Sequence, residues 1–171
     1  MCSSDLRITA LILDRPRHAD LISAVRKTGA SVSLIPDGDV AGVIHTADPE
    51  ATGIDIYLGI GGAPEGVLAA AALSCIGGQM QGRLIFDSET TRERAREMGH
   101  TDINRKLDMT DMAHGDVLFA ATGVTDGNLL DGVRFTKKAL VTHTVVMRSS
   151  SGTVRWIKAE HQDLDKFDDA I

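Results

Sequence analysis

The sequence predicts an α/β protein with a mixed sheet and helices on both faces of that sheet. Two patterns carry this prediction. Over residues 6–75, an apolar run, a polar turn and a helical pattern follow one another three times, which is typical of parallel strands joined by right-handed crossovers. The last third of the chain instead alternates β-rich runs around a turn at residues 149–152, which indicates an antiparallel hairpin.

The first unit begins with the apolar run at residues 6–13. Pro16 ends this run, because proline fixes φ and lacks a backbone N–H, and the loop around the proline carries Arg15 and Arg17. Apolar side chains then recur at helical spacing over residues 18–27, so we expect a helix there.

The second unit combines a β-rich run at residues 31–35 with a helix at residues 40–44. Pro36 stops the strand. Asp39 is expected to be the N-cap of the helix, because a carboxylate can accept a hydrogen bond from a free N–H of the first turn. Residues 48–53 are polar and contain proline and glycine, so we expect a loop that leads to the third strand.

The third unit places a strand at residues 54–58, the glycine turn at residues 59–66 and an alanine-rich helix at residues 67–73. Glycines let the backbone approach a ligand closely, and Pro64 suits a first helical turn, so N–H groups at this helix start are available to bind phosphate. Glu65 adds a carboxylate. Glycine-rich turns also occur without a ligand, and a first-turn glutamate stabilises the helix dipole, so the local sequence leaves both interpretations open.

The pattern is less regular beyond the alanine-rich helix. We expect a strand, an exposed helix capped by Ser88, a short helix and a buried strand, at residues 80–86, 88–98, 110–113 and 116–121 in that order. Three antiparallel strands follow at residues 133–136, 140–148 and 153–157.

Composition favours a single globular domain over residues 1–171, with 43% hydrophobic and 25% charged residues and no internal linker. The net charge of −6 argues against a nucleic-acid partner, which would need clustered lysines and arginines. No apolar run approaches the roughly 18 residues of a membrane span, and the first residues do not resemble a signal peptide, so we expect no membrane contact and a cytoplasmic location. Residues 1–5 and 163–171 are expected to be frayed.

Four single residues have simple structural interpretations. We expect His18 to be a polar residue at a helix start, His143 a strand side chain, Asp126 a turn residue and Cys75 a buried apolar side chain on the alanine-rich helix. None of the four is counted among the candidate site residues.

Polar residues follow each expected parallel strand at its carboxyl end, which is where ligands bind in such sheets. If the strands are neighbours, Arg15, Arg17, Asp37, Asp39 and Glu65 meet at one edge together with the glycine turn. Arginines and helix-start N–H groups bind phosphate, and aspartates accept hydrogen bonds from sugar hydroxyls, so the set predicts a sugar-phosphate ligand. Glu65 suits Mg²⁺ or Mn²⁺, although one carboxylate does not complete a metal site.

Four blocks resemble, in order and spacing, the C-terminal half of the class II fructose-1,6-bisphosphatases, a family that in cyanobacteria also acts on sedoheptulose 1,7-bisphosphate. The blocks are residues 14–18, 35–41, 60–73 and 120–127, and the resemblance covers roughly residues 6–161. It implies the C-terminal lobe of the sugar-phosphatase fold, which is inositol-phosphatase-like.

The resemblance implies metal-dependent hydrolysis of the 1-phosphate of fructose 1,6-bisphosphate, in gluconeogenesis or the Calvin cycle. Mn²⁺ or Mg²⁺ is the implied cofactor, and the full-length protein is implied to be a homo-oligomer. Glu65 is then a catalytic residue and a metal ligand. The implied substrate contacts are Arg15, Pro16, Arg17, Asp37, Gly38, Asp39 and Gly62.

The family's other metal carboxylates and a substrate-contacting tyrosine belong to an N-terminal lobe. The sequence has no matching metal motif, and Tyr57, its only tyrosine, lies inside an expected strand. We therefore interpret the chain as a truncated family member that is incomplete for catalysis. The alternative is a non-catalytic module that binds sugar phosphates.

Overall fold

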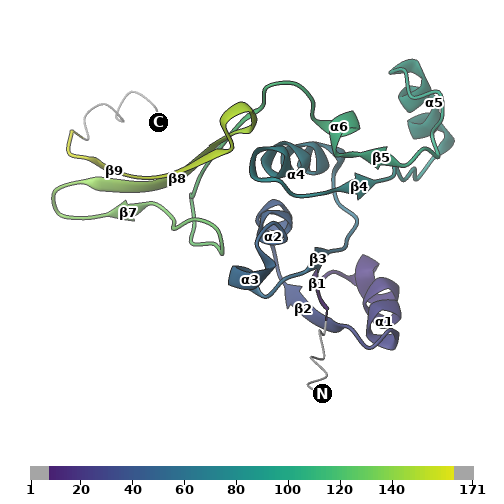
Figure 1. The fold of residues 1–171 in the computed structure, drawn as a ribbon, viewed down its shortest axis with the longest axis horizontal. Helices are drawn as coiled ribbons and strands as arrows, with labels where there is room; N and C mark the ends of the chain where they lie inside the picture. The colour runs from purple at the N-terminus through teal and green to yellow at the C-terminus, as the bar shows by residue number, and fades with distance from the viewer. Residues whose placement is uncertain (1–7, 164–171) are drawn as a thin grey trace.

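The structure, a computed structural model, describes residues 8–163. Helices and strands alternate through most of this range, which confirms the α/β class. The strands form a parallel sheet, a two-stranded sheet and an antiparallel sheet (Figure 1). The expectation of one mixed sheet is therefore wrong, because helix α2 packs between the parallel and antiparallel sheets and keeps them apart. The expected frayed ends, 1–5 and 163–171, lie outside the described residues except for Asp163.

The parallel sheet has the order β2-β1-β3, with β1 in the centre. Its first register pairs are Thr9 with Ser31 and Ala10 with Ile56. The central strand is buried on both faces, which explains its continuous apolar run. The three strands are neighbours, which is the condition for their polar turns to meet at one edge. Their bounds are β1 (Thr9–Leu13), β2 (Ser31–Ile35) and β3 (Ile56–Tyr57).

Short helices connect these strands, and two of them correct the sequence analysis. Gly38, with φ +85°, is the N-cap of α2, so Asp39 is the first helical residue and not the cap. The expected loop at residues 48–53 contains a helical turn, because the Asp48 carboxylate accepts from the Ala51 N–H and caps it. The bounds are η1 (Pro16–His18), α1 (Ala19–Lys27), α2 (Asp39–His45) and α3 (Pro49–Thr52).

Helix α4 (Ala63–Ile76) joins the two main parts of the core. It begins four residues earlier than expected, inside the glycine turn, and ends at Gly77 with φ +88°. Leu73 packs with Val43 of α2, whereas Cys75 packs with Val145 of the antiparallel sheet. The expected burial of Cys75 is confirmed. The position of α4 is thus set by contacts on two sides.

The segment after α4 forms a small arm at the far side of the molecule from β8 and β9 (Figure 1). Its strand β4 (Gln81–Gly82) is much shorter than the expected 80–86, because it pairs only with the equally short β5 (Leu107–Asp108), which the sequence did not reveal. Helix α5 (Glu89–Glu97) and its Ser88 cap are confirmed. The short α6 (Met109–Met112) returns the chain to α4.

The antiparallel sheet confirms the predicted hairpin of β8 (Leu140–Arg148) and β9 (Thr153–His161), which η2 (Ser149–Ser151) connects. Strand β6 (Leu118–Thr122) is not the buried strand that we expected. Its Phe119 faces the core, whereas Leu118 is 65% exposed, because α4 covers only one face of this sheet. Strand β7 (Arg134–Phe135) completes the sheet. No helix in the described range is long and apolar enough to cross a membrane.

Leu73→Ala should lower the free energy of unfolding by about 2–5 kcal/mol, because it leaves a cavity where α4 meets α2. Leu73 is 0% exposed, and Leu68 on the same helix, at 50% exposed, provides the matched Leu68→Ala control. Urea unfolding of the 171-residue chain measures both. Equal losses from the two substitutions would contradict the assigned core.

Candidate functional site

Three turns follow the carboxyl ends of the parallel strands and meet at one edge of the sheet. They lie at residues 14–18 after β1, 36–38 after β2 and 58–62 after β3. Because β1 lies between the other two strands, its turn adjoins both neighbours. We call this edge the strand-end corner and define it by Arg17, His18, Asp39, Ile60, Gly61, Gly62 and Glu65.

The backbone of Ile60 is held at both its N–H and its carbonyl by the turn after β1. The Arg17 Nε donates to the Ile60 carbonyl at 2.8 Å, and the Ile60 N–H donates to His18 Nε2 at 2.9 Å. The other ring nitrogen, Nδ1, lies 2.9 Å from the Leu13 carbonyl. His18 is the N-cap residue of α1, which confirms its interpretation as a polar residue at a helix start, and it is also fully buried. The ring joins the end of β1 to the glycine turn.

The Glu65 carboxylate caps its own helix. Its Oε2 accepts a hydrogen bond from the Gly62 N–H at 3.0 Å, which confirms a structural role at the start of α4. A Cβ atom added to Gly61 would lie 3.3 Å from Asp39 Oδ2 and 3.4 Å from Glu65 Oε2. Two carboxylates therefore flank the glycine turn at Gly61.

The charges of the strand-end corner act on one another. Burial raises the pKa of Asp39, and the nearby Glu65 carboxylate raises it further, against the lowering effect of the Val40 N–H. Burial also raises the pKa of Tyr57 to about 12, with a further rise from Asp39 and a smaller opposing effect of Arg17. The phenol of Tyr57 is thus a protonated neighbour of a carboxylate pair.

The donor types at the corner suit a hard divalent cation, because Mg²⁺ and Mn²⁺ prefer carboxylate oxygens. The number of donors is small. Within residues 8–163, no group of three or more His, Cys, Asp or Glu side chains is placed to hold a metal ion. Glu65, with the Asp39 carboxylate beside it, therefore fits one position of a metal shell and not a complete shell.

Asp39, the glycine turn and Glu65 of the corner line a broad cleft of about 1730 Å³. Tyr57 and the strands β4 and β5 also line it. Ligand pockets typically have volumes of about 300–1,000 Å³. The cleft is larger than this, so it has room for a phosphorylated sugar.

The structure brings some of the candidate residues together and leaves others apart. Arg17, Asp39, Gly62 and Glu65 belong to the corner. Arg15, Pro16, Asp37 and Gly38 are exposed in the adjoining turns, and the contacts found for Asp37 and Gly38 are local, such as the Gly38 N–H that donates to Asp37 Oδ1 at 2.8 Å.

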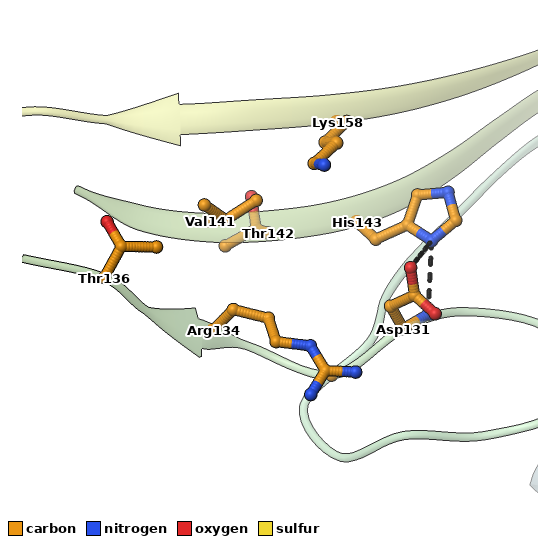
Figure 2. Close-up of a pocket in the computed structure, with 8 residues that line it drawn as sticks. Asp131, Arg134, Thr136, Val141, Thr142, His143 and Lys158 are labelled. Carbon is orange, nitrogen blue, oxygen red and sulfur yellow. Dashed lines mark hydrogen bonds and ion pairs between the residues drawn. The ribbon is translucent and has the colours of Figure 1, made fainter. Parts of the chain in front are cut away.

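A second, smaller hollow of about 260 Å³ lies on the antiparallel sheet (Figure 2). Its lining carries charges of both signs, from Arg134, Lys158 and Asp131. The Asp131 N–H donates to His143 Nδ1 at 3.1 Å, and Asp126 accepts from the Gly132 N–H at 2.9 Å. The interpretations of His143 as a strand side chain and of Asp126 as a turn residue are confirmed. The mixed charges give this hollow no preference for a phosphate.

Sequence reasoning missed His18 and Ile60 as parts of the corner, and Tyr57 as its neighbour. His18 contacts a residue 42 positions away, and nothing in the local pattern indicates this contact. Tyr57 was placed in a strand, which is correct, but its hydroxyl lies next to Gly59 and not in the sheet core. The one available signal was the position of His18 directly after Arg17.

Tyr57 should titrate with a midpoint of about 12 in the folded chain, because burial and Asp39 disfavour the phenolate. The chain has one tyrosine, so ultraviolet absorbance of phenolate reports this residue alone. Asp39→Asn should lower the midpoint part of the way towards about 10, the value for a free tyrosine. Asp126→Asn is the control, and circular dichroism verifies folding at each pH. A wild-type midpoint near 10 in the folded chain would contradict the geometry.

The chain is similar to known phosphatases over most of its length. A sequence profile of the family described as bacterial fructose-1,6-bisphosphatase, glpX-encoded, matches residues 3–161. The chain is 44% identical over 167 residues to the D-fructose 1,6-bisphosphatase class 2/sedoheptulose 1,7-bisphosphatase of Synechococcus sp. (strain JA-3-3Ab), with 90% of the chain and 48% of that relative covered. It is 42% identical over 175 residues to the protein of the same name from Synechococcus elongatus (strain ATCC 33912 / PCC 7942 / FACHB-805), with 95% and 49% covered.

The chain spans about half the length of these curated relatives, since the aligned shares are 48% and 49%. The family profile, in contrast, extends over nearly all of the chain, including every residue of the strand-end corner. By this match the chain belongs to the family of bacterial, glpX-encoded fructose-1,6-bisphosphatases.

Proposed function

We propose that this chain supplies the substrate-binding side and one metal ligand of a class II fructose-1,6-bisphosphatase, as an inositol-phosphatase-like lobe. The reaction is hydrolysis of the 1-phosphate of fructose 1,6-bisphosphate, and sedoheptulose 1,7-bisphosphate is a second substrate. The observation that carries the proposal is the meeting of an arginine, a glycine turn and two carboxylates at one sheet edge, in a chain of this family.

The phosphate-binding groups come from two turns. Arg17 uses Nε for the Ile60 carbonyl, so its two terminal nitrogens remain for phosphate oxygens, which a guanidinium binds in pairs. Arg15 lies exposed two residues earlier and adds a second positive charge. The glycine turn admits a phosphate close to its backbone at Gly62. Asp37 and Asp39 accept hydrogen bonds from sugar hydroxyls.

Glu65 can contribute to a cation site while it caps its helix. Its Oε2 accepts the Gly62 N–H, and the side-chain hydrogen bond between Glu65 and Asp39 needs a shared proton, whose place a cation can take. Bound Mn²⁺ or Mg²⁺ would stabilise negative charge on the phosphoryl oxygens and activate water. We propose that the remaining ligands come from the portion of the family's length that this chain does not span.

One observation favours a second candidate. The described residues offer no group of three potential metal ligands, which suits a non-catalytic module that binds sugar phosphates. Two measurements on the 171-residue chain separate the candidates: phosphate release from fructose 1,6-bisphosphate with Mn²⁺, and calorimetric binding of the same compound. Binding without release, both by the chain alone and after its fusion to the unmatched portion of a relative, supports the module.

Glu65→Gln should abolish metal-dependent phosphate release and leave the fold intact. The amide oxygen of glutamine still accepts the Gly62 N–H, so the cap remains, but the charge that holds the cation is lost. The assay uses a chimera that joins the unmatched portion of the Synechococcus sp. (strain JA-3-3Ab) relative to this chain. Glu50→Gln, in the first turn of α3, is the matched control. Near-normal turnover of Glu65→Gln at saturating Mn²⁺ or Mg²⁺ would refute the metal role.

Arg17→Ala should raise KM in the same chimera by about 10- to 100-fold, because hydrogen bonds to charged groups contribute about 1.5–3 kcal/mol. Arg26→Ala removes an exposed arginine from α1 and serves as the control. Steady-state kinetics with fructose 1,6-bisphosphate measures both variants. An unchanged KM for Arg17→Ala would exclude this side chain from phosphate binding.

A further inference from the structure

We propose that His18 is a positioning residue. It fixes the position of the glycine turn relative to the Arg17 guanidinium, so that both face the same phosphate. The inference rests on the proposed function, because it names what keeps the phosphate-binding groups of that site in place. The observations that carry it are the complete burial of His18 and its two hydrogen bonds.

The two hydrogen bonds determine the chemical state of the ring. The Ile60 N–H is a donor, so the ring nitrogen that it reaches, Nε2, must be unprotonated. The Leu13 carbonyl is an acceptor, so Nδ1 must carry the proton. His18 is therefore a neutral imidazole that donates at one end and accepts at the other, a pattern that most side chains cannot supply.

The Ile60 backbone lies between this imidazole and the neighbouring arginine. His18 accepts from its N–H at 2.9 Å and Arg17 donates to its carbonyl at 2.8 Å, so two consecutive residues of one turn hold the two peptide groups that flank the Ile60 Cα. Each peptide group is planar, so holding both restricts the φ and ψ of Ile60 between them. Gly61 and Gly62 follow at once, and the position of the glycine turn relative to the arginine depends on this contact.

Packing around the ring leaves the turn little freedom to move. A Cβ atom added to Gly59 would lie 3.2 Å from the Tyr57 hydroxyl and 3.5 Å from His18 Cε1, so the backbone passes closely between the two rings. Buried polar groups that lose a partner are costly, which favours the paired arrangement over alternatives. The glycine turn is thus held by His18 before any ligand binds.

Two amide substitutions each keep one of the two hydrogen bonds that His18 makes. In His18→Gln, the amide reaches the place of Nε2, so its oxygen can accept the Ile60 N–H. In His18→Asn, the shorter amide reaches the place of Nδ1, so its N–H can donate to the Leu13 carbonyl. Both variants lose one hydrogen bond and the same ring, and a merely structural role of His18 predicts the same effect from both. The positioning role predicts different effects.

The test measures amide hydrogen exchange of Ile60 in the 171-residue chain and the KM and kcat of the chimera. We expect His18→Asn to speed exchange at Ile60 by about tenfold, which corresponds to about 1.4 kcal/mol and lies within the range for one hydrogen bond, and to raise KM by about tenfold with a smaller change in kcat. His18→Gln should remain within about threefold of wild type in both quantities. His143→Gln is the control, because His143 Nδ1 also accepts a backbone N–H but lies on the antiparallel sheet.

Equal behaviour of His18→Asn and His18→Gln, or unchanged exchange at Ile60 in His18→Asn, overturns the proposal. A wild-type chimera that releases no phosphate counts against the proposed function alone, because hydrogen exchange in the chain still tests the contact. Faster exchange in His18→Asn together with an unchanged KM in an active chimera overturns the link to phosphate binding.

Discussion

The hydrogen-bonded contact at the Ile60 backbone is the interaction on which the strand-end corner depends. It joins the turn after β1 to the turn after β3, although β3 pairs with β1 over only two residues. Two residue pairs restrain the positions of the following loops only weakly. The buried His18 imidazole and the Arg17 guanidinium add the further restraint, and both come from one short 3₁₀ turn that Pro16 begins.

Helix α4 connects the strand-end corner to the hydrophobic core. Its first turn holds Glu65 and its second half fills two hydrophobic clusters, one against α2 and one against the antiparallel sheet. The start of the helix therefore cannot shift without disturbing both clusters. A carboxylate on such a helix is well placed for a ligand role, because its backbone is positioned by packing and not by the ligand.

The carboxylate pair explains why the corner suits a cation. Asp39 and Glu65 approach the same glycine from two elements, and the raised pKa of Asp39 reflects burial together with the neighbouring negative charge. Like charges at this separation are stabilised by a cation between them or by a shared proton. Within residues 8–163 the pair has no third acidic or histidine partner at metal-binding spacing, so the shell that it begins is partial.

The sequence by itself determined the α/β class, the order of the strand, turn and helix units, and a glycine turn before the alanine-rich helix with a glutamate in its first turn. These features depend on local contacts, such as the Glu65 carboxylate and the Gly62 N–H three residues away, which residue pattern and spacing reveal. Only the tertiary structure decided that Asp39 lies beside Glu65, that His18 is buried on Ile60, and that β6 exposes one face. Those outcomes depend on which elements pack together across many residues, and side-chain periodicity carries no information about distant partners.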